Sequence, residues 1–109
     1  MPQQETLDLI EKYIQSSNNN DIETFSSCFK EDATVLDEGQ KLQGKQAIIE
    51  WFLRNKQRYQ HQTKPLNIEV SNKEALLTAS VNGKFEGSPI TLKYRIKLES
   101  GLIQDLRIA

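Results

Sequence analysis

The sequence has few of the residues that build disulfides and metal centres. Its 109 residues include one cysteine, Cys28, and one histidine, His61. A single cysteine excludes an internal disulfide, and its apolar neighbours predict a buried structural thiol. A site of histidine and cysteine ligands needs several such residues together, so we expect no metal ion. The polar neighbours of His61 predict an exposed loop residue.

Concentrated charge and long apolar runs are also missing. Fourteen Lys and Arg residues against fifteen Asp and Glu give a net charge of −1, with no basic run. Nucleic acid binding requires a concentrated positive face, so we expect no nucleic acid partner. No apolar run has the length that crosses a bilayer, and the first ten residues lack the features of a signal peptide. We therefore expect a soluble, cytoplasmic protein that does not bind membranes. Glycine-rich phosphate loops and GxSxG motifs are absent as well.

The first half of the chain has the periodicity of helices. Apolar residues at helical spacing predict an amphipathic helix over about 4–18. Asp21 is a good N-cap for a second helix over 21–29. A third helix is predicted from 44 or 45 to about 59. The predicted apolar stripe of the second helix is Ile22, Phe25, Cys28 and Phe29, and that of the third is Ile48, Trp51, Phe52 and Tyr59.

The second half has the period of strands. Segments 66–70, 74–81, 90–98 and 102–109 are rich in apolar residues, and turn residues separate them. Segment 90–98 has the clearest alternation, with Lys93, Arg95 and Lys97 among the residues of its polar face. One face of this strand must therefore be covered and the other must meet water. Helices followed by an antiparallel meander predict one α+β domain over 1–109, with three N-terminal helices packed on a curved sheet.

A further short strand begins at Ala33 and ends with two acids, Asp37 and Glu38. Side chains alternate across a strand, so Asp37 shares a face with Ala33 and Val35, while Glu38 lies on the opposite face and is expected in solvent. If the face of Val35 is the interior, a carboxylate points inward, where charge is costly without a partner or a function. Two interpretations of Asp37 stay open: a base in a pocket, or the solvated first residue of a turn.

Several motifs resemble the SnoaL-like branch of the nuclear transport factor 2-like superfamily. A tyrosine is followed by Asn-x-x-Asp, an apolar helix and Phe-x-x-Asp-Ala-Thr-Val, within YIQSSNNNDIETFSSCFKEDATVLDEG. The resemblance continues over nearly the entire chain, in the stretches LQGKQAIIEWF, VNGKFEGSP and ITLKYRIKLESGLIQDLRIA. It implies the cystatin-like α+β cone shared by ketosteroid isomerase, scytalone dehydratase and polyketide cyclases. The same fold serves enzymes, transport adaptors and binding proteins, so it does not by itself imply one function.

The resemblance to ketosteroid isomerase implies roles for particular residues. In that enzyme an Asp is the general base, and a Tyr and a protonated Asp donate hydrogen bonds to the developing enolate oxygen. The resemblance places Tyr13 on the oxyanion tyrosine and Asp37 on the general base. The protonated acid has no counterpart, because the inward positions of the strand that should carry it are Leu92, Tyr94 and Ile96. Tyr94 is the one hydroxyl on that face.

These residues also have simpler interpretations. Tyr13 is either an oxyanion donor or a core aromatic residue whose hydroxyl finds any partner. Trp51, Phe52, Tyr59 and Phe85 either line an apolar cavity or only fill the core.

Two functions follow as expectations. One is a cofactor-independent isomerase, cyclase or dehydratase that acts on a small apolar carbonyl compound in the cone. The other is a non-catalytic binding or accessory domain with the same pocket. In either case the resemblance implies a homodimer that forms through the outer face of the sheet.

Overall fold

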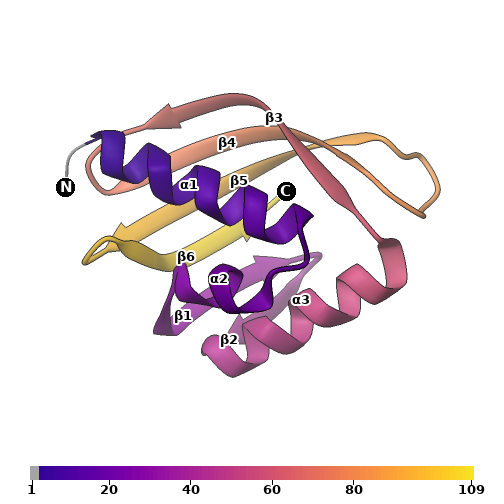
Figure 1. Ribbon diagram of the computed structural model, residues 1–109, viewed down its shortest axis with the longest axis horizontal. Helices are drawn as coiled ribbons and strands as arrows, with labels where there is room; N and C mark the ends of the chain where they lie inside the picture. Colours follow the sequence, from indigo (N-terminus) through magenta and orange to yellow (C-terminus); the bar gives the residue numbers. More distant parts are fainter. Residues whose placement is uncertain (1–2) are drawn as a thin grey trace.

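Three helices cover one face of a six-stranded sheet in the computed structural model, which describes residues 3–109 (Figure 1). The helices are α1 (Gln3–Asn18), α2 (Ile22–Ser27) and α3 (Lys45–Tyr59). The strands are β1 (Phe29–Asp37), β2 (Gln40–Gln43), β3 (Gln62–Val70), β4 (Glu74–Asn82), β5 (Ile90–Glu99) and β6 (Leu102–Ile108). The predicted α+β cone with three N-terminal helices is confirmed.

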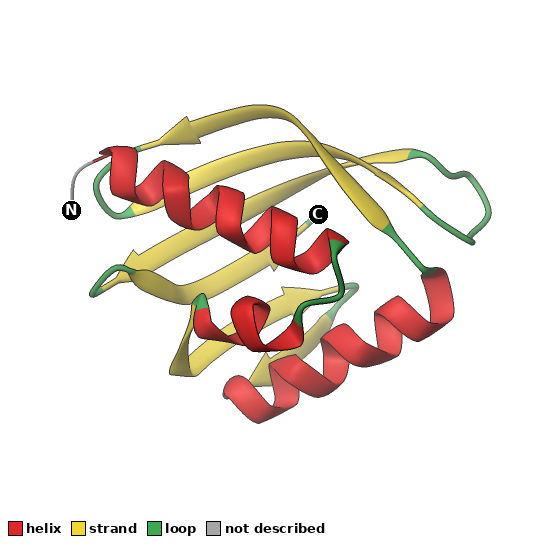
Figure 2. Ribbon diagram, viewed as in Figure 1, coloured by secondary structure: helices red, strands yellow, loops and turns green. Residues whose placement is uncertain are grey.

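The sheet is antiparallel except at one pair of strands. Its order is β2-β1-β6-β5-β4-β3, and β1 runs parallel to β6. The α1 helix packs on β3, and α3 packs on β1 and β2. Figure 2 shows the helices as a separate layer over the sheet. This arrangement leaves an interior between α1, α3 and the inner face of the long strands. None of the helices in residues 3–109 is long and apolar enough to cross a membrane.

The second helix is shorter than predicted. Asp21 caps it as expected, because its Oδ1 accepts a hydrogen bond of 3.2 Å from the backbone N–H of Thr24. The helix ends at Ser27, however, and the backbone N–H of Cys28 closes the last turn on the carbonyl of Phe25. Placing Phe29 in this helix was therefore wrong: Phe29 begins β1 and is fully buried. Cys28 is buried, as predicted.

Two parts of the sheet also differ from the sequence prediction. Residues 40–43 form the short strand β2, which was not predicted, and buried Leu42 pairs with Val35 of β1. The β3 strand begins at Gln62, four residues before its predicted start. A bulge between Pro65 and Asn67 shifts its register, so Leu66 is 55% exposed instead of facing the core.

The remaining alternation follows the prediction. On β4, Leu77, Ala79 and Val81 face the interior. On β5, the buried residues are Tyr94, Ile96 and Leu98, and the three basic residues of that strand are exposed. The inner face of β5 therefore brings the Tyr94 phenol into the interior of the cone.

Candidate functional site

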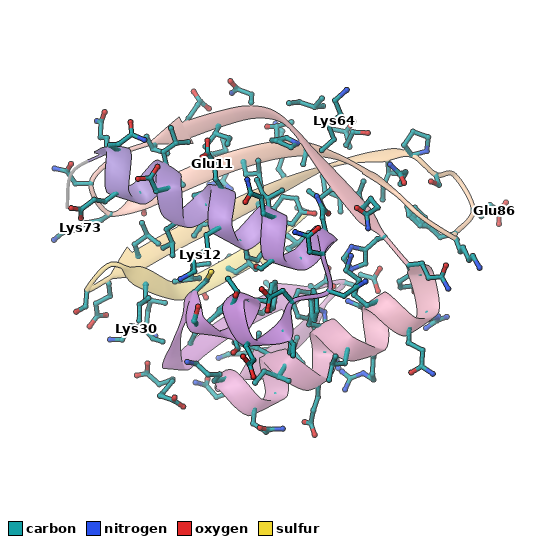
Figure 3. All side chains as sticks on the ribbon, viewed as in Figure 1. Glu11, Lys12, Lys30, Lys64, Lys73 and Glu86 are labelled. Carbon is teal, nitrogen blue, oxygen red and sulfur yellow. The ribbon has the colours of Figure 1, made fainter. Side chains whose placement is uncertain are left out.

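The interior of the cone holds a cavity of about 280 Å³. This volume is near the lower end of the range for small-molecule sites, roughly 300–1,000 Å³. Three of its lining residues, Glu38, Glu86 and Ile90, are exposed and mark the mouth. The mouth thus lies between the end of β1 and the loop that connects β4 to β5. Figure 3 shows Glu86 at the far end of that loop.

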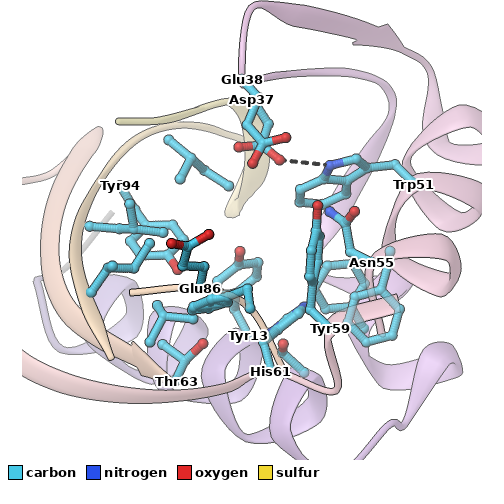
Figure 4. A pocket seen from close by; sticks show the side chains of 18 residues that line it. Tyr13, Asp37, Glu38, Trp51, Asn55, Tyr59, His61, Thr63, Glu86 and Tyr94 are labelled. Atoms are coloured by element: carbon cyan, nitrogen blue, oxygen red, sulfur yellow. Dashed lines mark hydrogen bonds between the residues drawn. The ribbon is translucent and has the colours of Figure 1, made fainter. Parts of the chain in front are cut away.

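The structure brings all seven predicted site residues to this one cavity (Figure 4). They come from α1, β1, α3, the loop between β4 and β5, and β5 itself. Their chemical roles stay predictions. The seven are Tyr13, Asp37, Trp51, Phe52, Tyr59, Phe85 and Tyr94.

Asp37 is the half-buried last residue of β1. Its Oδ2 accepts a hydrogen bond of 3.0 Å from the indole N–H of Trp51 (Figure 4). The turn that follows uses positive φ at Glu38 (51°) and at Gly39 (75°), so the chain reverses directly after the strand. Asp37 therefore stays in phase with Val35 and faces the cavity instead of being fully solvated, while its role as a base stays a prediction.

The surroundings of Asp37 act on its pKa in opposing directions. Burial raises the pKa of this carboxyl above the ordinary value, the Trp51 hydrogen bond lowers it, and the negative charge of Glu38 raises it. Burial dominates, so the net shift is upward. A carboxylate with a raised pKa is a stronger base than a solvated one, and perturbed acids of this kind concentrate at functional sites.

Tyr13 and Tyr94 lie in the same cavity, and each is 5% exposed. Their rings meet edge to face, with centroids 6.4 Å apart. Burial raises the pKa of Tyr13 well above its ordinary value and raises the pKa of Tyr94 to about 12. The charge of Asp37 contributes to both increases, while the Thr63 side chain opposes the rise at Tyr94. Both phenols are therefore neutral at pH 7 and can donate hydrogen bonds.

The Tyr13 hydroxyl has no partner among the side chains of the cavity. Within residues 3–109, no hydrogen bond joins it to another lining side chain (Figure 4). The hydroxyl oxygen is open to the cavity, because it is not among the fully buried unpaired side-chain oxygens of residues 3–109, which are Thr6 Oγ1 and Gln104 Oε1. It can donate a hydrogen bond to a ligand oxygen in the cavity.

Aromatic rings form much of the wall. Phe25 stacks on Phe52 with centroids 4.1 Å apart, and Phe85 meets the Tyr59 ring edge to face at 6.0 Å. Trp51 is 7% exposed. All five line the cavity. Phe25, Trp51 and Phe52 also belong to the hydrophobic core and Phe85 packs against it, so lining the cavity and filling the core are not exclusive.

Sequence reasoning missed several polar residues of the cavity. His61 lies in a loop, as predicted, but its predicted exposure is wrong, because it is half-buried and lines the cavity. Its pKa is lowered to about 4, mainly by burial and also by the charge of Lys56, whose Nζ donates a hydrogen bond to the His61 carbonyl. Gly83 packs against this segment: a Cβ there would lie 2.7 Å from the Tyr59 carbonyl oxygen and 3.1 Å from the His61 Cα. Burial of His61 thus comes from a distant part of the chain, and no local pattern signals it.

Further polar side chains complete the cavity. Glu38 is exposed, as predicted, yet it lines the mouth. The polar residues that sequence reasoning did not assign to a pocket are Ser17, Asn55, Thr63 and Glu86. Among residues 3–109, no group of three or more His, Cys, Asp or Glu side chains has an arrangement that could hold a metal ion.

Comparisons with known proteins identify the family. Solved structures include a "putative polyketide cyclase" from Sinorhizobium meliloti, with 36% identity, a TM-score of 0.91 and coverage of 94% of both chains. A cystatin-fold protein from Novosphingobium aromaticivorans has 17% identity, a TM-score of 0.81 and coverage of 94% of this chain and 96% of that one. A protein of ketosteroid isomerase-like fold from Catenulispora acidiphila, in complex with trimethylamine, has 13% identity, a TM-score of 0.81 and coverage of 93% and 83%. No curated protein matches the chain.

A family model for the SnoaL-like domain matches residues 3–91, which is most of the chain. The resemblance inferred from the sequence motifs is therefore confirmed, and this chain belongs to the SnoaL-like family.

Proposed function

We propose that this protein is a cofactor-independent isomerase, cyclase or dehydratase that acts on a small, mostly apolar carbonyl compound. One observation carries the proposal: a half-buried carboxylate with a raised pKa, Asp37, faces the same cavity as two buried neutral phenols, Tyr13 and Tyr94. Membership of the SnoaL-like family and the similarity to the Sinorhizobium meliloti protein support it.

The proposed chemistry begins with removal of a proton from a carbon next to the carbonyl. The Asp37 carboxylate takes this proton, and the electron pair of the broken C–H bond moves onto the carbonyl oxygen. The Tyr13 or Tyr94 hydroxyl donates a hydrogen bond to the oxyanion that forms. Asp37 then returns its proton to the same carbon or to another atom of the substrate. A positioned base of this kind contributes on the order of 10²–10⁴-fold to the rate.

Exchange of hydrogen for deuterium tests the first step without knowledge of the natural substrate. A panel of small cyclic ketones in D₂O, followed by proton NMR, reports loss of the proton next to the carbonyl. We expect Asp37→Asn to slow the catalysed exchange by about 10²–10⁴-fold. Asp32→Asn is the matched control, because Asp32 is an exposed acid of the same strand. Equal exchange by the wild type and by Asp37→Asn would remove Asp37 from the mechanism.

A binding protein without catalysis is the second candidate. The observation in its favour is the inner face of β5, where the family resemblance places the protonated acid of ketosteroid isomerase. The residues there are Leu92, Tyr94 and Ile96, and none is an acid. Ligand binding in the cavity without exchange of any ketone would support this candidate over the enzyme. The Catenulispora acidiphila protein, of the same fold, holds a small molecule in its solved structure.

We also propose that two copies pair through the outer face of the sheet, as the family resemblance implies. The exposed basic residues of β5, Lys93, Arg95 and Lys97, lie on this face. Acidic side chains of the second copy would have to complement them, because like charges repel at close range. Light scattering at high protein concentration measures the mass directly, and a monomer would refute the pairing.

A further inference from the structure

The charges that line the cavity have one sign. Asp37, Glu38 and Glu86 contribute carboxylates, and no Lys or Arg belongs to the lining within residues 3–109. His61 is the one lining residue that could carry a positive charge, but burial and the charge of Lys56 lower its pKa to about 4, so its imidazole is neutral at pH 7. The cavity therefore disfavours a negatively charged ligand.

Two cations of α3 contact residues of the cavity wall without belonging to the lining themselves. Lys56 is buried behind the wall and its Nζ is held by the His61 carbonyl, while the Arg58 guanidinium lies 5.1 Å from the centroid of the Tyr59 ring. Both residues belong to the last turn of α3, at the His61 end of the cavity. Their field offsets part of the negative potential there. Asp37 and Glu38 lie at the other end of the cavity from His61 (Figure 4).

The mouth holds two carboxylates from different segments of the chain. Glu38 follows β1, and Glu86 lies in the loop between β4 and β5. Both are exposed, and neither belongs to an ion pair formed within residues 3–109. Each is therefore available to a charge that enters the mouth. A cation close to either carboxylate gains Coulomb energy without first displacing an internal partner.

The walls next to the mouth suit a cation as well. Trp51, Tyr59 and Phe85 line the cavity, and the negative face of an aromatic ring attracts an ammonium group within about 6 Å. Deeper in the cavity, the Tyr13 hydroxyl has no hydrogen bond to another lining side chain within residues 3–109. This hydroxyl is open to the cavity and free to donate, so it suits an occupant that carries a hydrogen-bond acceptor at its inner end.

We propose that the occupant of this cavity is a small molecule with a protonated amine at the mouth, held by Glu38 and Glu86, and an apolar part that carries its acceptor oxygen toward Tyr13. The inference rests on the proposed function in one respect, since it uses the same cavity as a small-molecule site. It goes further by naming the charge and the orientation of the ligand. It requires no catalysis, so the binding candidate and the enzyme candidate would share it.

Three probes with the same ring and different end groups test the charge preference: 2-phenylethylamine, 2-phenylethanol and phenylacetate. Trp51 is the only tryptophan of the chain and lines the cavity, so its fluorescence reports binding at this site. In water, a carboxylate about 5 Å from a cation contributes roughly fourfold in affinity. We expect the amine to bind about tenfold more tightly than the alcohol at low salt, and phenylacetate to bind most weakly. High salt should reduce the preference, because it screens exposed charges.

The paired variant Glu38→Gln with Glu86→Gln identifies the source of the preference. It should bring the affinity of the amine close to that of the alcohol and leave the affinity of the alcohol unchanged. Its matched control is Glu11→Gln with Glu69→Gln, which changes the net charge equally at exposed positions outside the cavity. The control should keep the preference for the amine.

Three results would overturn the inference. They are phenylacetate binding as tightly as the amine, a preference for the amine that survives in the Glu38 and Glu86 variant, and no binding by any of the three probes. Deuterium exchange of neutral ketones does not use this charge preference. If only the exchange assay fails, the proposed catalysis is refuted and the charge preference of the cavity stands. If only the amine preference is absent, the charge preference is refuted and the proposed catalysis stands.

Discussion

Trp51→Phe should increase the proton affinity of the Asp37 carboxylate. The substitution keeps an aromatic ring at a position that is 7% exposed, and it removes the N–H that donates to Asp37 at 3.0 Å. The indole stabilises the ionised carboxylate and so lowers its pKa, against the rise caused by burial. Without this donor the ionised form loses a partner, and the pKa of Asp37 rises further.

The size of the effect follows from the strength of the bond. A hydrogen bond to a charged group contributes about 1.5–3 kcal/mol when both partners are buried. Asp37 is only half-buried, so water replaces part of the lost bond. About 1 kcal/mol remains, and since roughly 1.4 kcal/mol corresponds to a factor of ten, the proton affinity should rise about fivefold.

Carbon-13 NMR of the aspartate carboxyl groups across a pH titration measures this directly, with the Asp37 signal identified by its loss in Asp37→Asn. Tyr59→Phe is the control, because it removes a hydroxyl of the same helix and the same cavity that does not bond Asp37. If the proposed base mechanism holds, the rate of ketone exchange rises with pH as Asp37 loses its proton. The acid limb of that profile should then move to higher pH in Trp51→Phe. An Asp37 titration curve that is unchanged by Trp51→Phe would refute the role given to the indole.

Two further predictions concern stability. The pKa of His61 is about 4 in the folded protein and 6.5 in the unfolded chain, so the unfolded chain binds the extra proton as pH falls through this window and the fold loses stability. Between pH 7 and pH 4.5, the free energy of unfolding measured in urea should therefore fall by about 1–2 kcal/mol less in His61→Gln than in the wild type, a figure that allows for the partial exposure of His61. Equal decreases in the two proteins would contradict this. The Asn18 side chain donates a hydrogen bond to the carbonyl of Thr63 and accepts one from its N–H, both at 2.8 Å. Asn18→Ala should therefore lower the free energy of unfolding by about 2 kcal/mol, which corresponds to a decrease of roughly 10 °C in Tm measured by circular dichroism. Exposed Asn19→Ala is its control, and an equal loss in both variants would refute the role of the tie to Thr63.

Local periodicity explains what the sequence could predict. Alternation along β5 placed Tyr94 on the covered face, and alternation along β1 placed Asp37 in phase with Val35. Both follow from the two-residue period of a strand, which needs no knowledge of the rest of the fold. The strong alternation in these two strands was enough to predict that the Asp37 carboxylate and the Tyr94 phenol face the same interior.

Features that depend on distant parts of the chain escaped prediction. Phe29 has helical spacing relative to Phe25, but pairing of β1 with β6 draws it into the sheet, where it lies opposite Ile103. Leu66 fits a strand pattern, yet the bulge beside it turns its side chain outward. His61 has only polar neighbours in sequence, and its burial depends on the close approach of Gly83. In each case tertiary pairing or packing outweighs the local pattern.

The electrostatics of the cavity also constrain how the two phenols could act. Both have raised pKa values, and the negative charge of Asp37 contributes to each rise. They are therefore poor proton donors toward a substrate oxygen, although they remain good hydrogen-bond donors. In the proposed reaction, protonation of Asp37 by the substrate would remove the charge that opposes an oxyanion at the moment when the oxyanion forms. Tyr13 and Tyr94 would then stabilise the oxyanion while keeping their protons, so that Asp37 alone carries the transferred proton.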